Sequence, residues 1–251
     1  MPRLLMEQQQ IRGMQQFKFS GVRTENLGAT EYTIVTIAVD ESGSISGFEG
    51  DLLKSLIAAV EACKKSPASD NLLLRVIKFS TMWTDGIMEI HGFKPLTEID
   101  PANDYGNFQP GGCTPLYDAT FSAVAATVSY AEKLTTDDFA VNGIVFVITD
   151  GVECGHRSVA SPAMIKAEVQ KAIRGEGIES LITVLIGINA SNCRSELQAF
   201  QQDAGIDQFI NAGDANKSNL AKLARFVSQS VSSQSQALGT GGPSQTISAT
   251  I

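Results

Sequence analysis

Short runs of uncharged, β-branched residues alternate along the chain with longer segments in which apolar residues recur every three or four positions. Thr33 to Val39 is TIVTIAV, which is typical of a strand buried on both faces of a sheet. Phe48 to Cys63 follows with the apolar spacing of a helix. The alternation continues, with strands expected at 72–79, 87–93, 143–149, 181–188 and 208–211, and helices expected from 114 and over 161–174, 193–204 and 217–231.

This order of elements predicts a doubly wound α/β fold, in which a mostly parallel central sheet is covered by helices on both faces. The segment 87–93 is short and mixed in polarity, so we expect it to be an antiparallel edge strand. The segment 100–112 is rich in Pro, Asn, Asp and Gly and is expected to be a loop, with Thr114 capping the helix that follows.

The two ends of the chain differ from this body. Gln8 to Gln16 is rich in glutamine and indicates a flexible arm or a loose helix, and 17–28 is a candidate for an extra edge strand. After Phe226 there is no charged or aromatic residue, which is typical of a disordered tail or one that orders on a partner. We therefore expect an N-terminal arm or edge extension over 1–28, one domain over 29–231 and a flexible tail over 232–251.

Composition narrows the classes of function. With 19 basic and 27 acidic residues the net charge is −8, which argues against nucleic acid as the partner. The four cysteines (Cys63, Cys113, Cys154 and Cys193) include no C-x-x-C pair, which favours free thiols in a reducing compartment. Neither a signal peptide nor a membrane span is evident, so we expect a cytoplasmic protein, with a virion component as the alternative.

Oxygen-bearing side chains follow or face the ends of neighbouring expected strands, where open α/β sheets bind their ligands. The segments are DESGS (40–44), GGCTP (111–115) and TDG (149–151). Together they supply two carboxylates and three hydroxyls, a donor set that suits a hard cation: Mg²⁺ or Mn²⁺, or Ca²⁺ where more ligands gather. The candidate ligands are Asp40, Ser42, Ser44, Thr114 and Asp150.

In this arrangement the chain resembles the von Willebrand factor A (vWA) family, of the prokaryotic or phage type, over roughly residues 32–231. The family's metal-ion-dependent adhesion site is D-x-S-x-S, a distant Thr and a distant Asp, and the five candidate ligands match it in order. The flanking segments GGCTPLYDA and VFVITDG are similar too. The resemblance implies a Rossmann-like vWA fold, with direct metal contacts from the two serines and Thr114. It also implies that Asp40 and Asp150 act mostly through water.

The resemblance implies a protein-binding module for adhesion or scaffolding, in which the held cation accepts a carboxylate from a partner protein. The alternative is a structural or regulatory subunit of a larger assembly, either beside an AAA+ ATPase or within a virion or surface array. There the metal would be secondary. No phosphate-binding G-x-x-x-x-G-K-[ST] or G-x-G-x-x-G motif is present, and we expect no enzymatic activity.

Several nearby residues have simpler interpretations. Asp118 is expected to complement the dipole of its helix, and Glu41 to be a solvated charge in its loop. Met82 and Trp83 either form an exposed contact patch or cover the edge of the sheet. His156 is expected to be a polar loop residue, because two donors in one loop do not make a zinc site.

Overall fold

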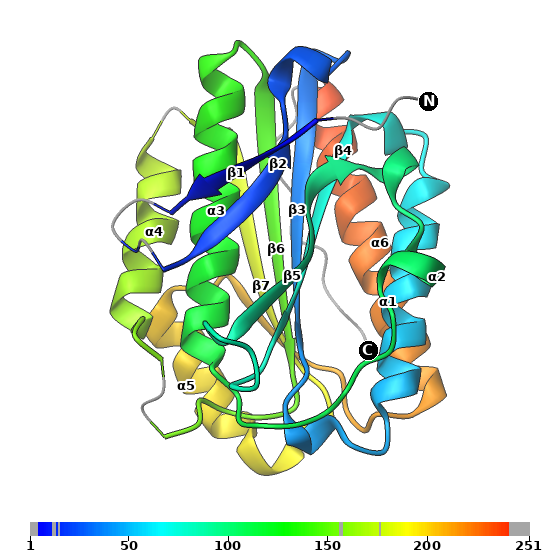
Figure 1. Cartoon of the computed structure of the whole chain (residues 1–251), viewed down its shortest axis with the longest axis vertical. Coiled ribbons are helices and arrows are strands. Elements are labelled where there is room, and N and C mark those ends of the chain that lie inside the picture. The colour runs from blue at the N-terminus through cyan, green and yellow to red at the C-terminus, as the bar shows by residue number, and fades with distance from the viewer. Residues whose placement is uncertain (1–4, 12–13, 15, 156–157, 176, 241–251) are drawn as a thin grey trace.

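The computed structural model describes residues 5–11, 14, 16–155, 158–175 and 177–240, which form an eight-stranded sheet with helices on both faces (Figure 1). The strands are β1 (Met6–Gln10), β2 (Lys18–Val22), β3 (Glu31–Asp40), β4 (Leu72–Phe79), β5 (Ile87–Pro95), β6 (Ala140–Thr149), β7 (Ser180–Gly187) and β8 (Gln208–Asn211). The helices of four residues or more are α1 (Glu49–Lys64), α2 (Pro101–Asp104), α3 (Leu116–Thr136), α4 (Pro162–Arg174), α5 (Arg194–Ala204) and α6 (Lys217–Thr240).

The strand order is β1-β2-β5-β4-β3-β6-β7-β8. From β4 to β8 all neighbours are parallel, while β5 runs antiparallel to β4. This confirms the doubly wound, mostly parallel α/β fold. The central strand β3 is buried along nine of its ten residues, which explains why its sequence is an unbroken apolar run instead of an alternating one.

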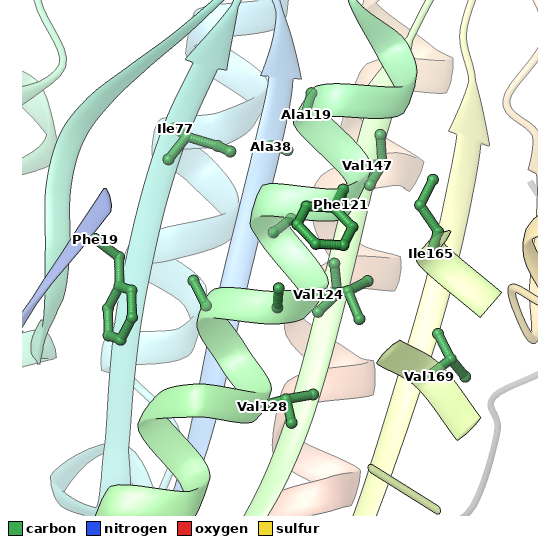
Figure 2. Close-up of a cluster of buried hydrophobic side chains, with 14 of the residues drawn as sticks. Phe19, Ala38, Ile77, Ala119, Phe121, Val124, Val128, Val147, Ile165 and Val169 are labelled. Atoms are coloured by element: carbon green, nitrogen blue, oxygen red, sulfur yellow. The ribbon is translucent and has the colours of Figure 1, made fainter. Parts of the chain in front are cut away.

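Two hydrophobic cores lie on opposite faces of the sheet. One packs the strands against α3, α4 and α5, and the other packs them against α1 and α6 (Figure 1). Figure 2 shows the first core, in which Ala119, Val124 and Val128 of α3 lie among Ala38 and Val147 of the strands. Each fully buried Val, Leu, Ile or Phe stabilises the fold by about 1.5–3 kcal/mol. These layers hold the carboxyl ends of β3 and β6 in place.

The prediction of a flexible arm or loose helix at Gln8 to Gln16 is wrong for its first residues, because Gln8 to Gln10 belong to β1. This strand pairs antiparallel with β2, and β2 pairs parallel with β5 through Gly21 and Phe93. The expected extra strand within 17–28 is present as β2, and β5 is antiparallel but is not the outermost strand. Apolar contacts hold β2 against the sheet, because Phe19 packs edge-on against Phe93 on β5 and against Tyr130 on α3.

The closing helix also differs from expectation, because α6 continues past Val231 to Thr240. The tail expected from residue 232 therefore begins with two further helical turns, and residues 241–251 lie outside the described residues. The buried stripe of α6 extends through Gln234 to Leu238, and the Asn142 side-chain amide donates to the Gln234 carbonyl at 3.4 Å. Among the residues described, no helix is long and apolar enough to cross a membrane.

The segment after β5 is mostly loop, as expected, but it includes the short helix α2. Thr114 does not cap α3, since Pro115 occupies the N-cap position and no side chain caps the helix. This leaves the Thr114 hydroxyl available for other contacts.

His91 on β5 provides a test of the packing. It is buried and stacks on Tyr105, and this burial lowers the pKa of His91 to about 4. The unfolded chain has a histidine pKa near 6.5, so as pH falls from about 6.5 towards 4 the unfolded state gains a proton that the folded state excludes, and stability drops. Between pH 7 and pH 5 we expect wild type to lose about 2 kcal/mol more than His91→Gln. Urea unfolding at both pH values measures this, and parallel losses in the two proteins would contradict it.

Candidate functional site

The two candidate carboxylates lie at neighbouring strand ends. Asp40 is the last residue of β3 and Asp150 follows β6, and these strands pair in parallel up to Val39 and Ile148. Asp40 is almost fully buried, while Asp150 is partly exposed. The parallel pairing of β3 and β6 thus places both carboxylates at one edge of the sheet, as the sequence predicted.

Hydrogen bonds through two serines connect the carboxylates. The Ser42 backbone N–H donates to Asp40 Oδ1 at 2.8 Å, and the hydroxyls of Ser42 and Ser44 are 2.9 Å apart. The Ser44 hydroxyl donates to Asp150 Oδ1 at 2.7 Å. Four of the five sequence-predicted residues therefore form one continuous hydrogen-bonded chain.

Thr114 reaches the same edge from the loop before α3. The Gly43 N–H donates to the Gly112 carbonyl at 3.1 Å, which brings this loop against residues 40–44. A Cβ placed on Gly151 would lie 3.7 Å from Thr114 Oγ1, so the hydroxyl lies beside the turn that follows Asp150. Gly112 permits this approach, because its φ of +66° favours glycine and a Cβ there would be 2.8 Å from the Ser80 hydroxyl. The fifth candidate thus joins the other four.

Burial sets the electrostatics of the two carboxylates. It raises the pKa of Asp40 to about 6, against the opposing effect of the hydrogen bonds from Thr149 and Ser42. Burial also raises the pKa of Asp150, opposed by the Ser44 hydroxyl. Both pKa shifts mean that the ionised carboxylates have lost favourable solvation. A nearby positive charge would offset this loss, because it favours the ionised form.

Thr149 is a site residue that the motif did not identify. Its hydroxyl donates to Asp40 Oδ2 at 2.7 Å and accepts from the Gly151 N–H at 3.1 Å. It therefore holds the buried carboxylate and the turn after β6 in a fixed relation. Its only sequence signal was its place before Asp150 at the end of a buried strand.

The donor chemistry of the cluster fits a hard cation. The five side chains offer carboxylate and hydroxyl oxygens and no nitrogen or sulfur, a set that Mg²⁺, Mn²⁺ and Ca²⁺ accept. Within the described part of the chain, no group of three or more His, Cys, Asp or Glu side chains is placed to hold a metal. A cation at this edge would therefore depend on the hydroxyls as well as on the two aspartates.

Glu41 corrects the expectation of a solvated charge. Its side chain is fully buried and its Oε1 accepts from Lys78 Nζ at 2.7 Å and from the Gln109 N–H at 2.8 Å. Its other oxygen accepts from the Trp83 indole at 3.2 Å. Trp83 is thus half-buried in a polar network, while the neighbouring Met82 is exposed.

Two more acidic residues hold the loop that follows β6. Asp118 accepts from the backbone N–H groups of Val159 and Ala160 at 2.9 and 2.7 Å, which corrects the expectation that it only complements the dipole of α3. Glu153 accepts from the Tyr117 N–H at 2.9 Å. Both contacts tie this loop to the first turn of α3. None of the four cysteines, all within the described residues, forms a disulfide, and His156 lies outside the described residues.

Comparisons with known proteins agree on the fold. No family model matches the sequence, and the comparison with curated proteins finds no relative. The pilus adhesin SpaC from Lactobacillus rhamnosus GG is similar in structure at a TM-score of 0.57 and 10% identity, over 86% of this chain and 32% of SpaC. Proximal thread matrix protein 1 from the mussel byssus is similar at a TM-score of 0.50 and 20% identity, over 81% of this chain and 47% of that protein.

The vWF domain of the type V pili tip protein Mfa5 from Porphyromonas gingivalis has a TM-score of 0.48 and 12% identity, over 88% of this chain and 99% of that one. The chain spans about a third of SpaC and about half of the thread matrix protein. At such identities the likenesses show the fold alone. This chain shares its α/β fold with SpaC and with the thread matrix protein.

Proposed function

We propose that the chain is a protein-binding module that holds one divalent cation, with Mg²⁺ as the expected ion and Mn²⁺ or Ca²⁺ as alternatives. The observation that carries the proposal is the hydrogen-bonded chain from Asp40 through Ser42 and Ser44 to Asp150, with the Thr114 hydroxyl beside it. Two desolvated carboxylates and three hydroxyls gathered at the carboxyl edge of a parallel sheet favour a bound cation over a merely structural cluster.

The five candidate ligands would have different roles at the cation. Ser42, Ser44 and Thr114 would offer neutral oxygens directly to the cation, while the two aspartates would act mostly through water. Since the side chains in direct contact would be neutral, the cation would stay electrophilic and could accept a carboxylate oxygen from a partner protein at an open position. Thr149 keeps Asp40 oriented for this role through its hydrogen bond to Oδ2. The proposal describes a binding protein and not an enzyme.

The structural likenesses support adhesion or scaffolding as the class of function. SpaC is named as a pilus adhesin and the mussel protein as a thread matrix protein, and this chain shares their α/β fold. The likeness to a thread matrix protein supports the alternative function, which is a structural subunit of a larger assembly in which the metal is secondary. The four cysteines form no disulfide with one another, which favours a reducing compartment, and we propose the cytoplasm.

Metal removal separates these two functions. The hydrophobic cores need no ion, so we expect EDTA to lower the melting temperature by only a few degrees, about 1–2 kcal/mol of lost stability. Partner binding should instead be lost, since a partner carboxylate would meet two aspartates without the cation between them. The measurement is capture of partner proteins on the immobilised chain with Mg²⁺ and with EDTA, beside a melting curve for each condition.

Thr114→Ala is the matched variant, because it removes one neutral ligand and leaves the charge of the site unchanged. We expect Mg²⁺-dependent capture to weaken while circular dichroism stays native-like. Thr97→Ala, in the loop after β5, is the control and should capture as wild type does. Unfolding in EDTA, or equal capture by Thr114→Ala, would favour the structural alternative.

A further inference from the structure

Three loops beside the candidate metal site meet at one buried carboxylate. Glu41 lies between Asp40 and Ser42 in the loop after β3, and its side chain has no exposed surface. It accepts hydrogen bonds from Lys78 at the end of β4 and from the Trp83 indole in the next turn. A third donor is the backbone N–H of Gln109, in the loop that leads to Thr114.

Lys78 completes an enclosed ion pair. Its ammonium group lies 2.7 Å from Glu41 Oε1, and it is 5.3 Å from the ring centre of Trp83 and 5.4 Å from that of Phe108. Both rings are within the range of a cation–π contact. A buried ion pair usually stabilises a fold no better than apolar side chains of similar size. The Glu41–Lys78 pair is therefore better explained by the loop conformation that it fixes than by a contribution to stability.

That geometry is the path of residues 108–114. The Gln109 N–H is held by the Glu41 side chain, and the Gly111 N–H donates to the Glu41 carbonyl at 3.2 Å. One residue thus binds the loop twice, through its side chain and through its backbone. An apolar side chain at position 41 would fill the space but would leave the Gln109 N–H and the Trp83 indole without an acceptor.

We infer that Glu41 is a positioning residue for the candidate metal site: it holds the 108–114 loop so that the Thr114 hydroxyl lies beside the turn that follows Asp150. This inference rests on the proposed function for its link to a cation. The loop-holding role stands on the contacts alone. Glu41, the second residue of the D-x-S-x-S segment, thus has a role in this chain that the motif does not specify.

The decisive variant replaces the ion pair by apolar side chains. Glu41→Leu with Lys78→Met keeps the volume and leaves no unpaired charge, so the fold should persist. We expect Mn²⁺ affinity in isothermal titration to fall about 10- to 100-fold, the usual effect of losing a residue that orients metal ligands. Trp83 is the only tryptophan in the chain, and its fluorescence should shift to longer wavelengths as the loop opens.

Conservative rescue distinguishes positioning from general packing. Glu41→Gln with Lys78→Met restores one acceptor oxygen, which can take the place of Oε1 and accept from the Gln109 N–H, so it should recover part of the Mn²⁺ affinity. Glu25→Gln, an exposed acid near the start of β3 at the opposite end of the sheet, is the control for charge and should bind as wild type does. Wild-type affinity in the Leu/Met variant, or no recovery in the Gln/Met variant, would overturn the inference.

Hydrogen exchange tests the loop without any metal. The side chain of Gln109 is exposed, yet its amide proton should exchange slowly, because Glu41 holds it. Exchange as fast as that of a free loop amide would overturn the inference in the wild-type protein itself. If wild type binds no Mn²⁺ but the Gln109 amide is protected, the proposed function fails while the loop-holding role of Glu41 is supported.

Discussion

Asp40→Asn is expected to abolish Mn²⁺ binding and, at the same time, to stabilise the fold. Asparagine keeps an oxygen that can accept from the Ser42 N–H or from the Thr149 hydroxyl, so the local hydrogen bonds need little rearrangement. It removes a buried charge whose pKa in the folded state is about 6, above the ordinary range of an aspartate. Because the ionised form is the disfavoured one, the charge costs stability at pH 7, on the order of 1–3 kcal/mol.

Isothermal titration and urea unfolding at pH 7 measure the two halves of this prediction. Wild type should bind about one Mn²⁺ ion per chain, and the variant should bind at least a hundredfold more weakly. Asp70→Asn, an exposed acid before β4, should change neither quantity. Equal Mn²⁺ affinity in Asp40→Asn would rule out the proposed site. A clear loss of stability would mean that the Asp40 charge has a favourable partner in the apo protein.

Glu89→Ala is expected to be the most destabilising single change outside the hydrophobic cores. Arg75 on β4 is fully buried and its Nε donates to Glu89 Oε2 at 2.7 Å. The described residues supply no partner for its two terminal nitrogens. Glu89 also accepts from the Ser20 N–H at 3.0 Å, so it links β5 to β2.

Removing this carboxylate leaves a buried guanidinium uncompensated, which costs about 3–5 kcal/mol. For a chain of this length the melting temperature should fall by about 10 °C. Asp51→Asn breaks the exposed pair with Lys54 and should leave the melting temperature unchanged. Adding Arg75→Met to Glu89→Ala should restore much of the stability. A melting temperature near that of wild type in Glu89→Ala alone would show that water reaches Arg75.

The local pattern of apolar and polar residues predicted most of the fold, because the central strands and helices are strongly periodic in sequence. The strand at 72–79 has the expected bounds, and the helix expected over 161–174 begins at Pro162 with Ser161 as its N-cap, since β-branched runs and a Ser-Pro helix start are local signals. The five candidate ligands were predicted for a similar reason: Asp40, Ser42, Ser44 and Asp150 lie at or just after strand ends, and Thr114 lies in the loop before α3.

What the pattern did not predict depends on distant partners. The glutamines of β1 resemble a free arm until β2 is present to pair with them. Nothing near Glu41 in the sequence indicated burial, because its partner Lys78 lies on β4 and its partner Gln109 lies in the loop before α3. The last turns of α6 have almost no apolar residue except Leu238, and their contacts are with distant residues, such as the hydrogen bond from Asn142 on β6 to the Gln234 carbonyl.

The place of β2 in the sheet also has a consequence for the order of folding. This strand is synthesised before its sheet neighbour β5, and its Ser20 N–H bonds to Glu89 about seventy residues later. Contacts between such distant segments form slowly, because a long loop must close before they are gained. Strands β1 and β2 are therefore expected to dock only after β4 and β5 have formed. Until then Phe17 and Phe19 stay exposed, and a nascent chain stalled before residue 95 should be a preferred target for chaperones.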